Sequence, residues 1–238
     1  MQLSPGKGTI NLDNISSVGH VLSELKRLNQ VLPNSELNNL QVFNGAYIVV
    51  TNQVNTALND GYYSEPIFVE EFVVTFAKYY FKALNDFCDY GAMPEVWQKV
   101  AQSPKPSKSP AFISLLLGAN AHINHDLPLA LAETMDKFKG IADTYILNIL
   151  KTDKILMKSS HEILDSFDEN SRIFNFIKKR LEFVYRMPTM YLILHWRKGA
   201  WNSYKQYANS QTGPSNFANR SNRIANRLNF WRSRLSSA

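Results

Sequence analysis

The stretch SEPIFVEEFVVTFAKYYFKALNDFCDYG, residues 64–91, decides the fold class, because its centre suits a strand by residue type whereas its length suits a helix. Its aromatic side chains recur every three to four residues, a spacing that places them on one face of a helix. Ser64-Glu65-Pro66 is typical of a helix start, since proline is tolerated in the first turn. We therefore predict one long helix that carries Phe68, Phe72, Phe76, Tyr79 and Tyr80.

Helical signals continue on both sides of this stretch. Ser16 or Ser17 can cap a helix whose apolar residues recur at helical spacing before Pro33. A second helix is expected over about residues 36–59, and a short one contains Trp97. Further helices are expected over residues 141–157, 160–167, 171–185 and 188–208.

No strand-turn-strand pattern and no repeat at a fixed period occurs in the sequence. Proline, serine and lysine indicate a solvated loop at residues 103–110, and the segment SQTGPSN at residues 210–216 sets off a final helix. We predict an all-α fold, a single domain of about eight or more helices in an elaborated bundle. We expect residues 1–212 to form the helical domain, with the polar segment at 118–133, and residues 213–238 to form a basic amphipathic helix packed on it.

The composition suits a packed core in a soluble protein. Of the 238 residues, 45% are hydrophobic and 12% are aromatic. Cys88 is the single cysteine, so the chain can form no internal disulfide and no cysteine-rich zinc site. The N-terminal residues lack a signal-peptide pattern, and the apolar runs fall far short of the roughly 20 residues that span a membrane. We therefore expect a cytoplasmic protein.

Positive charge gathers at the C-terminal end. No acidic residue follows Glu182, whereas nine of the 26 basic residues do, and the other 17 are outnumbered by 20 acidic ones. In the last helix, Arg220, Arg223, Arg227 and Arg234 line one face, and Ile224, Leu228, Trp231 and Leu235 line another. Such a helix can pack on the body, lie peripherally on an anionic membrane or dock on a protein partner. The acidic body argues against binding to nucleic acid.

The stretch LLLGANAHINHDLPLALAE, residues 115–133, places polar groups inside an apolar helical segment. In a continuous helix His122 and Asp126 share a face, Asn120 and Asn124 form a neighbouring pair, and His125 points elsewhere. Pro128 lacks an N–H, so the helix is expected to kink or restart there. The polar motif comprises residues Asn120, His122, Asn124, His125 and Asp126.

The His122–Asp126 pair has three readings. It can bind a divalent metal ion with a third ligand from another helix, or form an acid–base pair in which the carboxylate orients the imidazole. In the third reading the two groups satisfy each other in the core, and Asp126 caps the helix that restarts at Pro128. The sequence has no phosphate-binding glycine loop, so no nucleotide cofactor is expected.

The segment NAHINHDLP, residues 120–128, resembles the N-A-H-I-N-x-D-L-P motif of a bacterial helical domain-of-unknown-function family, number fifty-nine ninety-five. Looser similarities lie in DTYILNIL (residues 143–150) and RKGAW (residues 197–201), and the whole resemblance covers roughly residues 42–208, without the basic tail. The resemblance implies a helical fold and no reaction. It implies polar positions on separate helices at Asn120, His122, Asn124, Asp126, Asp143, Asn148 and Arg197.

These signals favour an enzyme that acts on a small, largely apolar molecule bound between helices. His122 is the expected general base or metal ligand, and Asp126 orients it or shares the metal. Asp143 is the expected third polar partner, and Arg197 is expected to hold an anionic group. The groups expected to contact substrate are Asn120, Asn124, Asn148, Phe76, Tyr80 and Trp201. The alternative is a non-catalytic helical binding or scaffold module whose polar motif is a buried structural network.

Overall fold

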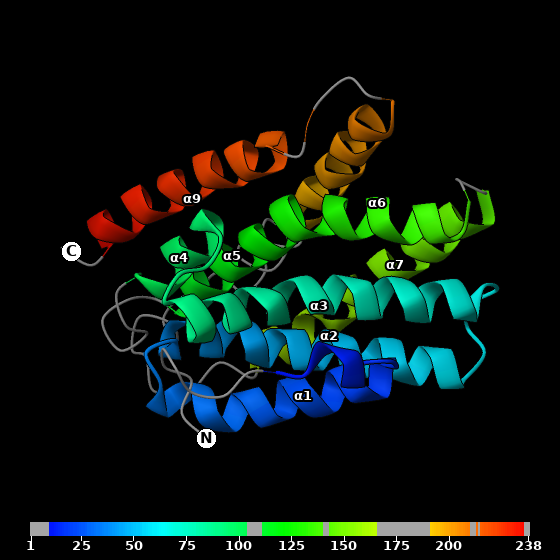
Figure 1. Cartoon of the computed structure of the whole chain (residues 1–238), viewed down its shortest axis with the longest axis horizontal. Coiled ribbons are helices and arrows are strands. Elements are labelled where there is room, and N and C mark those ends of the chain that lie inside the picture. The colour runs from blue at the N-terminus through cyan, green and yellow to red at the C-terminus, as the bar shows by residue number, and fades with distance from the viewer. Residues whose placement is uncertain are drawn as a thin grey trace.

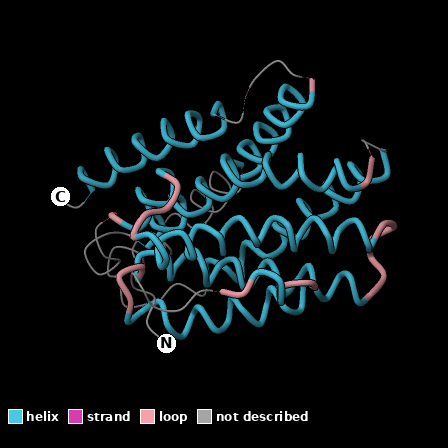
Figure 2. The backbone as a smooth tube through the Cα atoms, viewed as in Figure 1, coloured by secondary structure: helices cyan, strands magenta, loops and turns pink. Residues whose placement is uncertain are grey.

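The decisive segment forms a single helix, α3 (Pro66–Tyr90), in a computed structural model that describes residues 10–103, 111–139, 143–165, 191–209, 213 and 215–235. Pro66 stands in its first turn, and Gly91 ends it in the left-handed region with φ 66°, donating its N–H to the carbonyl of Phe87. The described residues form helices and connecting loops, with no strand among them (Figure 2). The all-α prediction is confirmed.

Helix α1 (Val18–Val31) begins at the predicted cap, because the Ser17 hydroxyl accepts the N–H of His20 at 3.1 Å. Helix α2 (Gln41–Asn59) starts five residues later than predicted. Two 3-10 turns, Leu32–Asn34 and Asn38–Leu40, fill the connection that Pro33 interrupts. Helix α1 packs against both α2 and α3, in the lower half of Figure 1.

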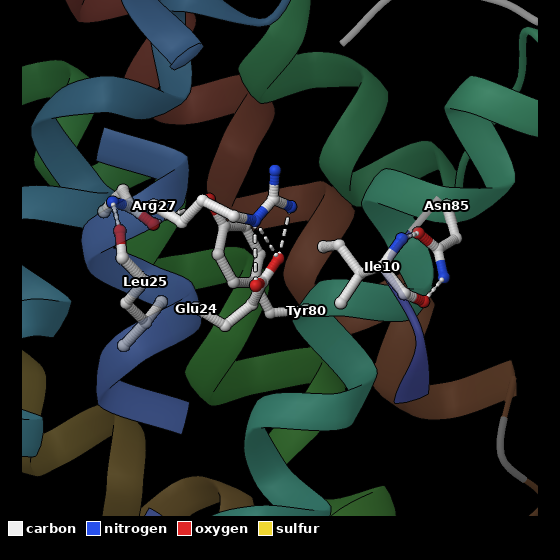
Figure 3. Close-up of polar contacts among 7 residues, drawn as sticks. Ile10, Glu24, Leu25, Arg27, Tyr80 and Asn85 are labelled. Carbon is white, nitrogen blue, oxygen red and sulfur yellow. Dashed lines mark hydrogen bonds and ion pairs between the residues drawn. The ribbon is translucent and has the colours of Figure 1, made fainter. Parts of the chain in front are cut away.

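Side-chain amides fasten the first helices together (Figure 3). Asn85 of α3 accepts the N–H of Ile10 at 2.7 Å and donates to its carbonyl at 2.8 Å, so the incoming segment is held by both backbone groups. Asn44 of α2 donates to the carbonyl of Leu25 in α1 at 2.9 Å. These bonds satisfy polar groups that would otherwise be buried without partners.

Four further helices follow in the described chain: α4 (Glu95–Ala101), α5 (Ala111–Ala121), α6 (Leu127–Lys137) and α7 (Asp143–Asp165). Helix α7 corrects the sequence prediction, which broke it near residues 157–160. Ser159 is accommodated inside the helix because its hydroxyl donates to the carbonyl of Ile155 at 2.9 Å. Residues 191–208 are helical, and α9 (Ser215–Leu235) follows. The predicted helix at 171–185 and most of the predicted loop at 103–110 lie outside the described residues.

Helix α5 and the segment after it lie where two hydrophobic clusters meet. Helix α5 contacts α2, α4 and α9, whereas α6 contacts α3 (Figure 1). One cluster contains Leu25, Leu117 and Ala121, and the other contains Ile123 and Leu127. Residue 122 therefore sits between the two clusters. Within the part of the chain that the structure describes, no helix has both the length and the apolarity to cross a membrane.

Gly118 allows α5 to approach α2 closely, since an added Cβ would lie 2.5 Å from the Cβ of Phe43. We expect Gly118→Ala to lower the free energy of unfolding by about 1–3 kcal/mol through overpacking. Gly45→Ala is the control, because its added Cβ meets nothing closer than Asn29 Oδ1 at 4.0 Å. That variant should gain about 0.5–1 kcal/mol of stability. Urea denaturation of both variants measures the difference, and equal stabilities would contradict the close approach.

Candidate functional site

Five residues, His122–Asp126, form a π-helical turn between α5 and α6. Pro128, in the first turn of α6, supplies no N–H, and the Leu127 N–H donates to the carbonyl of His122, five residues earlier. The helix therefore continues through a wider turn, where the sequence predicted a kink or restart. The predicted cap at Asp126 is wrong, because its side chain makes no capping bond to α6. Single π turns inside α-helices occur frequently at functional sites.

The Asp126 carboxylate is the hub of the turn. It is 1% exposed and accepts hydrogen bonds from Trp97 Nε1 at 3.2 Å, His122 Nδ1 at 3.0 Å and His125 Nδ1 at 2.7 Å. The prediction that His125 points elsewhere is wrong, because its ring reaches the carboxylate of the neighbouring residue. Three donors around one carboxylate fix its position and compensate for its burial.

The hydrogen bonds also set the charge states. Burial acts to raise the pKa of Asp126, but the hydrogen bonds from His122 and His125 outweigh it and hold that pKa below its usual value. Burial lowers the pKa of His122, against the opposing effect of Asp126. At neutral pH His122 is therefore a neutral imidazole that donates its Nδ1–H to a carboxylate. Its Nε2 is left as an acceptor, and it has no hydrogen-bond partner among the described residues.

Five aromatic rings, which we call the aromatic box, surround the His122 imidazole. Phe76 stacks on it with ring centroids 3.6 Å apart and planes at 9°, and Tyr47 lies 4.7 Å away. Phe43, Tyr80 and Trp97 complete the box at centroid distances of 5.6, 6.2 and 6.2 Å. These rings come from α2, α3 and α4, so helix packing encloses His122 in apolar surroundings.

Two of the three aromatic residues expected to contact substrate lie in this box. Phe76 and Tyr80 were expected there, and the structure places both against His122. Trp201 does not join them: its ring packs on Tyr204 at 5.3 Å, and Lys205 Nζ lies 5.5 Å from its centroid. Phe43, Tyr47 and Trp97 were missed. The only local signal for the first two was their four-residue spacing, which does not reveal what they face.

The two asparagines of the motif attach the C-terminal helix. Asn124 donates to Asn120 Oδ1 at 3.0 Å, and Asn120 donates to the carbonyl of Ser221 in α9 at 3.0 Å. The Ser221 hydroxyl returns a bond to the carbonyl of Asn120 at 3.3 Å. The Asn120 amide, which was expected to contact substrate, therefore joins α5 to α9 in this structure.

The other predicted positions lie apart from the π turn. Asp143 is exposed in the first turn of α7. Asn148 is buried and accepts the N–H of Ser64 at 3.0 Å, so it fixes the loop that leads into α3. Arg197 forms an ion pair with Asp153 and is 9% exposed. Its charge also contributes to lowering the pKa of His122, so of these three it is the one electrostatically coupled to the motif.

A metal site at His122 and Asp126 would need a third ligand. Among residues 10–103, 111–139, 143–165 and the described C-terminal segments, no group of three or more His, Cys, Asp or Glu side chains is arranged to hold a metal ion. The His122 Nδ1 and the Asp126 carboxylate are bonded to each other. That bond fits both the acid–base reading and the structural pair, and it leaves Nε2 as the nitrogen of His122 that could bind another group.

Helix α9 packs on α4, α5 and the π turn. Phe217, Ser221 and Ala225 are buried on its inner side, and Arg223 and Arg227 are exposed. Arg220 is half-buried over Gly199, and burial lowers its pKa, assisted by the charge of Arg223. Contact of these exposed arginines with a membrane or a protein partner stays a prediction.

The profile of a family described as a family of unknown function (DUF5995) matches residues 18–233. No curated protein and no solved structure matches the chain. The matched region runs through most of α9, so the expectation that the basic tail falls outside the resemblance is wrong.

Proposed function

The chain belongs to DUF5995, a family of unknown function, and we propose that it is an enzyme acting on a small, largely apolar molecule with His122 as general base. The observation that carries this proposal is the free Nε2 of a neutral imidazole whose Nδ1–H is held by a buried carboxylate. A base that is neutral and unbonded at its reactive atom can accept a proton from a substrate at neutral pH.

Asp126 supports this role in two ways. Its bond to Nδ1 fixes the tautomer and the ring orientation, and its negative charge stabilises the imidazolium that forms after proton transfer. Trp97 and His125 hold the carboxylate in place from its other sides. The aromatic box surrounds the base with apolar rings and keeps bulk water away from it.

The test is substrate discovery with a matched histidine control. Purified protein is incubated with an extract of small apolar metabolites, and compounds that disappear are followed by liquid chromatography and mass spectrometry. We expect the wild type to consume at least one compound and His122→Gln to do so at least about 100-fold more slowly. His20→Gln, a change at an exposed histidine on α1, should keep the wild-type rate. Consumption of no compound, or an unchanged rate in His122→Gln, would contradict the proposal.

The second candidate is a non-catalytic helical module, and the reciprocal Asn120–Ser221 bonds favour it, because they give Asn120 a structural task. Under this candidate the wild type consumes nothing in the same assay. His122→Gln would then act on stability alone, and its melting temperature would be its only altered property.

A further inference from the structure

Among the described residues, the π turn and the aromatic box hold three buried side-chain polar atoms without a partner: Asn124 Oδ1, His122 Nε2 and the Tyr47 hydroxyl. The last two belong to neighbouring rings. Trp97 Nε1 is bonded to Asp126, and the Tyr80 hydroxyl reaches Asn44 Oδ1 at 3.5 Å. The hydroxyl of Tyr47 and Nε2 of His122 are buried with no such bond. Their ring centroids are 4.7 Å apart, and they come from separate elements, α2 and the π turn.

The two atoms are chemically complementary. His122 Nε2 is an acceptor, because the Nδ1 of the neutral ring carries the proton that Asp126 accepts. Burial raises the pKa of Tyr47, aided by the negative charge of Asp126, so its hydroxyl stays protonated and can donate. Buried polar groups in native proteins almost always have a partner, and one bound polar atom could satisfy this acceptor and this donor on neighbouring rings.

We propose that Tyr47 and His122 together bind one hydroxyl group of a small apolar ligand, which donates to Nε2 and accepts from the phenol. The inference rests on the proposed function and names its substrate class, an apolar alcohol or phenol. A hydroxyl donates and accepts through a single oxygen, whereas an ether or ketone oxygen only accepts and a hydrocarbon does neither. The five rings of the aromatic box lie around the imidazole and give that oxygen apolar surroundings.

The same geometry defines a proton-transfer step. The substrate O–H bond breaks, a new N–H bond forms at Nε2, and the electron pair of the broken bond stays on oxygen. The resulting oxyanion keeps the hydrogen bond from Tyr47, and the imidazolium keeps its bond to Asp126. Tyr47 is therefore a catalytic residue in this proposal, because it touches the reacting oxygen.

Phenol, anisole and toluene test the proposal, since they share a ring and differ in hydrogen bonding. Binding is followed on the ¹⁵N resonance of His122 Nε2, assigned as the signal that His122→Gln lacks. We expect phenol to bind wild-type protein at least about tenfold more tightly than toluene, with anisole between them. Tyr47→Phe should bring anisole to the affinity of toluene and reduce the preference for phenol. Tyr79→Phe is the control, because the Tyr79 hydroxyl donates to Glu133 on the surface.

Each outcome separates this inference from the proposed function. Three outcomes would overturn the hydroxyl site. Phenol and toluene could bind equally, or Tyr47→Phe could keep the preference for phenol. No probe could bind at all, as when the two atoms hold only a water molecule. If the inference fails while His122→Gln still abolishes turnover, the base stands and its substrate belongs to another class. If the probes behave as expected while no metabolite is consumed, the chain binds hydroxyl compounds without transforming them.

Discussion

Asp126→Ala is expected to lower the free energy of unfolding by about 3–5 kcal/mol, the largest loss that we predict for a polar side chain. The substitution removes the one acceptor shared by Trp97 Nε1, His122 Nδ1 and His125 Nδ1. The first two donors are buried among apolar rings, where each unsatisfied polar group costs about 1–3 kcal/mol. Urea denaturation at neutral pH, where Asp126 is ionised, measures the loss.

The matched control is Asp136→Ala, which removes an exposed carboxylate ten residues further along, in α6. Its effect should stay within about 0.5 kcal/mol. If Asp126→Ala does not fold, Asp126→Asn keeps one acceptor oxygen and is expected to fold with a smaller loss. Equal stabilities for the alanine variants at 126 and 136 would mean that the carboxylate is not the hub of the turn.

Phe217→Ala is the second large effect, with an expected loss of about 3–5 kcal/mol in the free energy of unfolding. Phe217 is 1% exposed on the inner side of α9, and its ring meets Tyr207 edge-on at 5.8 Å. Truncation leaves a cavity under α9 and weakens the helix that Asn120 holds through Ser221. The prediction treats α9 as a part of the core, although its sequence resembles a charged appendage.

Phe230→Ala on the same helix is the control, because that ring is 54% exposed. We expect it to cost less than about 1 kcal/mol, since little apolar surface leaves the interior. Thermal and urea unfolding of the two phenylalanine variants side by side give the comparison. Similar small losses in both would show that α9 is not packed on α4 and α5.

The predictions that the structure confirms rest on the spacing of residues close together in the sequence. The aromatic period of α3 and the Ser17 cap of α1 depend on residues within one or two turns. The same holds for the bonds of His122 to Asp126 and of Asn124 to Asn120, each spanning four residues at 3.0 Å. Such contacts follow from helix geometry and need no knowledge of the neighbouring helices.

Contacts between helices could not be predicted in this way. Tyr47 and Trp97 reach His122 only because α2 and α4 pack around the π turn, and nothing in their own segments specifies that neighbour. Asn148 was read as a substrate contact, but packing of α7 places it under the loop at Ser64. The bond of His125 to Asp126 joins adjacent residues, and the α-helical spacing rule describes only residues three or four apart.

The π turn also lets the chain carry one extra residue without changing the relative phase of α5 and α6. A π turn completes one revolution with more residues than the 3.6 of an α-helix. Deleting one residue, for example Ile123, would therefore restore α-helical hydrogen bonding and leave α6 facing nearly the same way. Leu127, Ala130 and Leu131 would stay in the second cluster. The deletion would thus act on the polar residues of the turn while the two flanking helices kept their packing, so the turn is a local adjustment that the rest of the fold does not register.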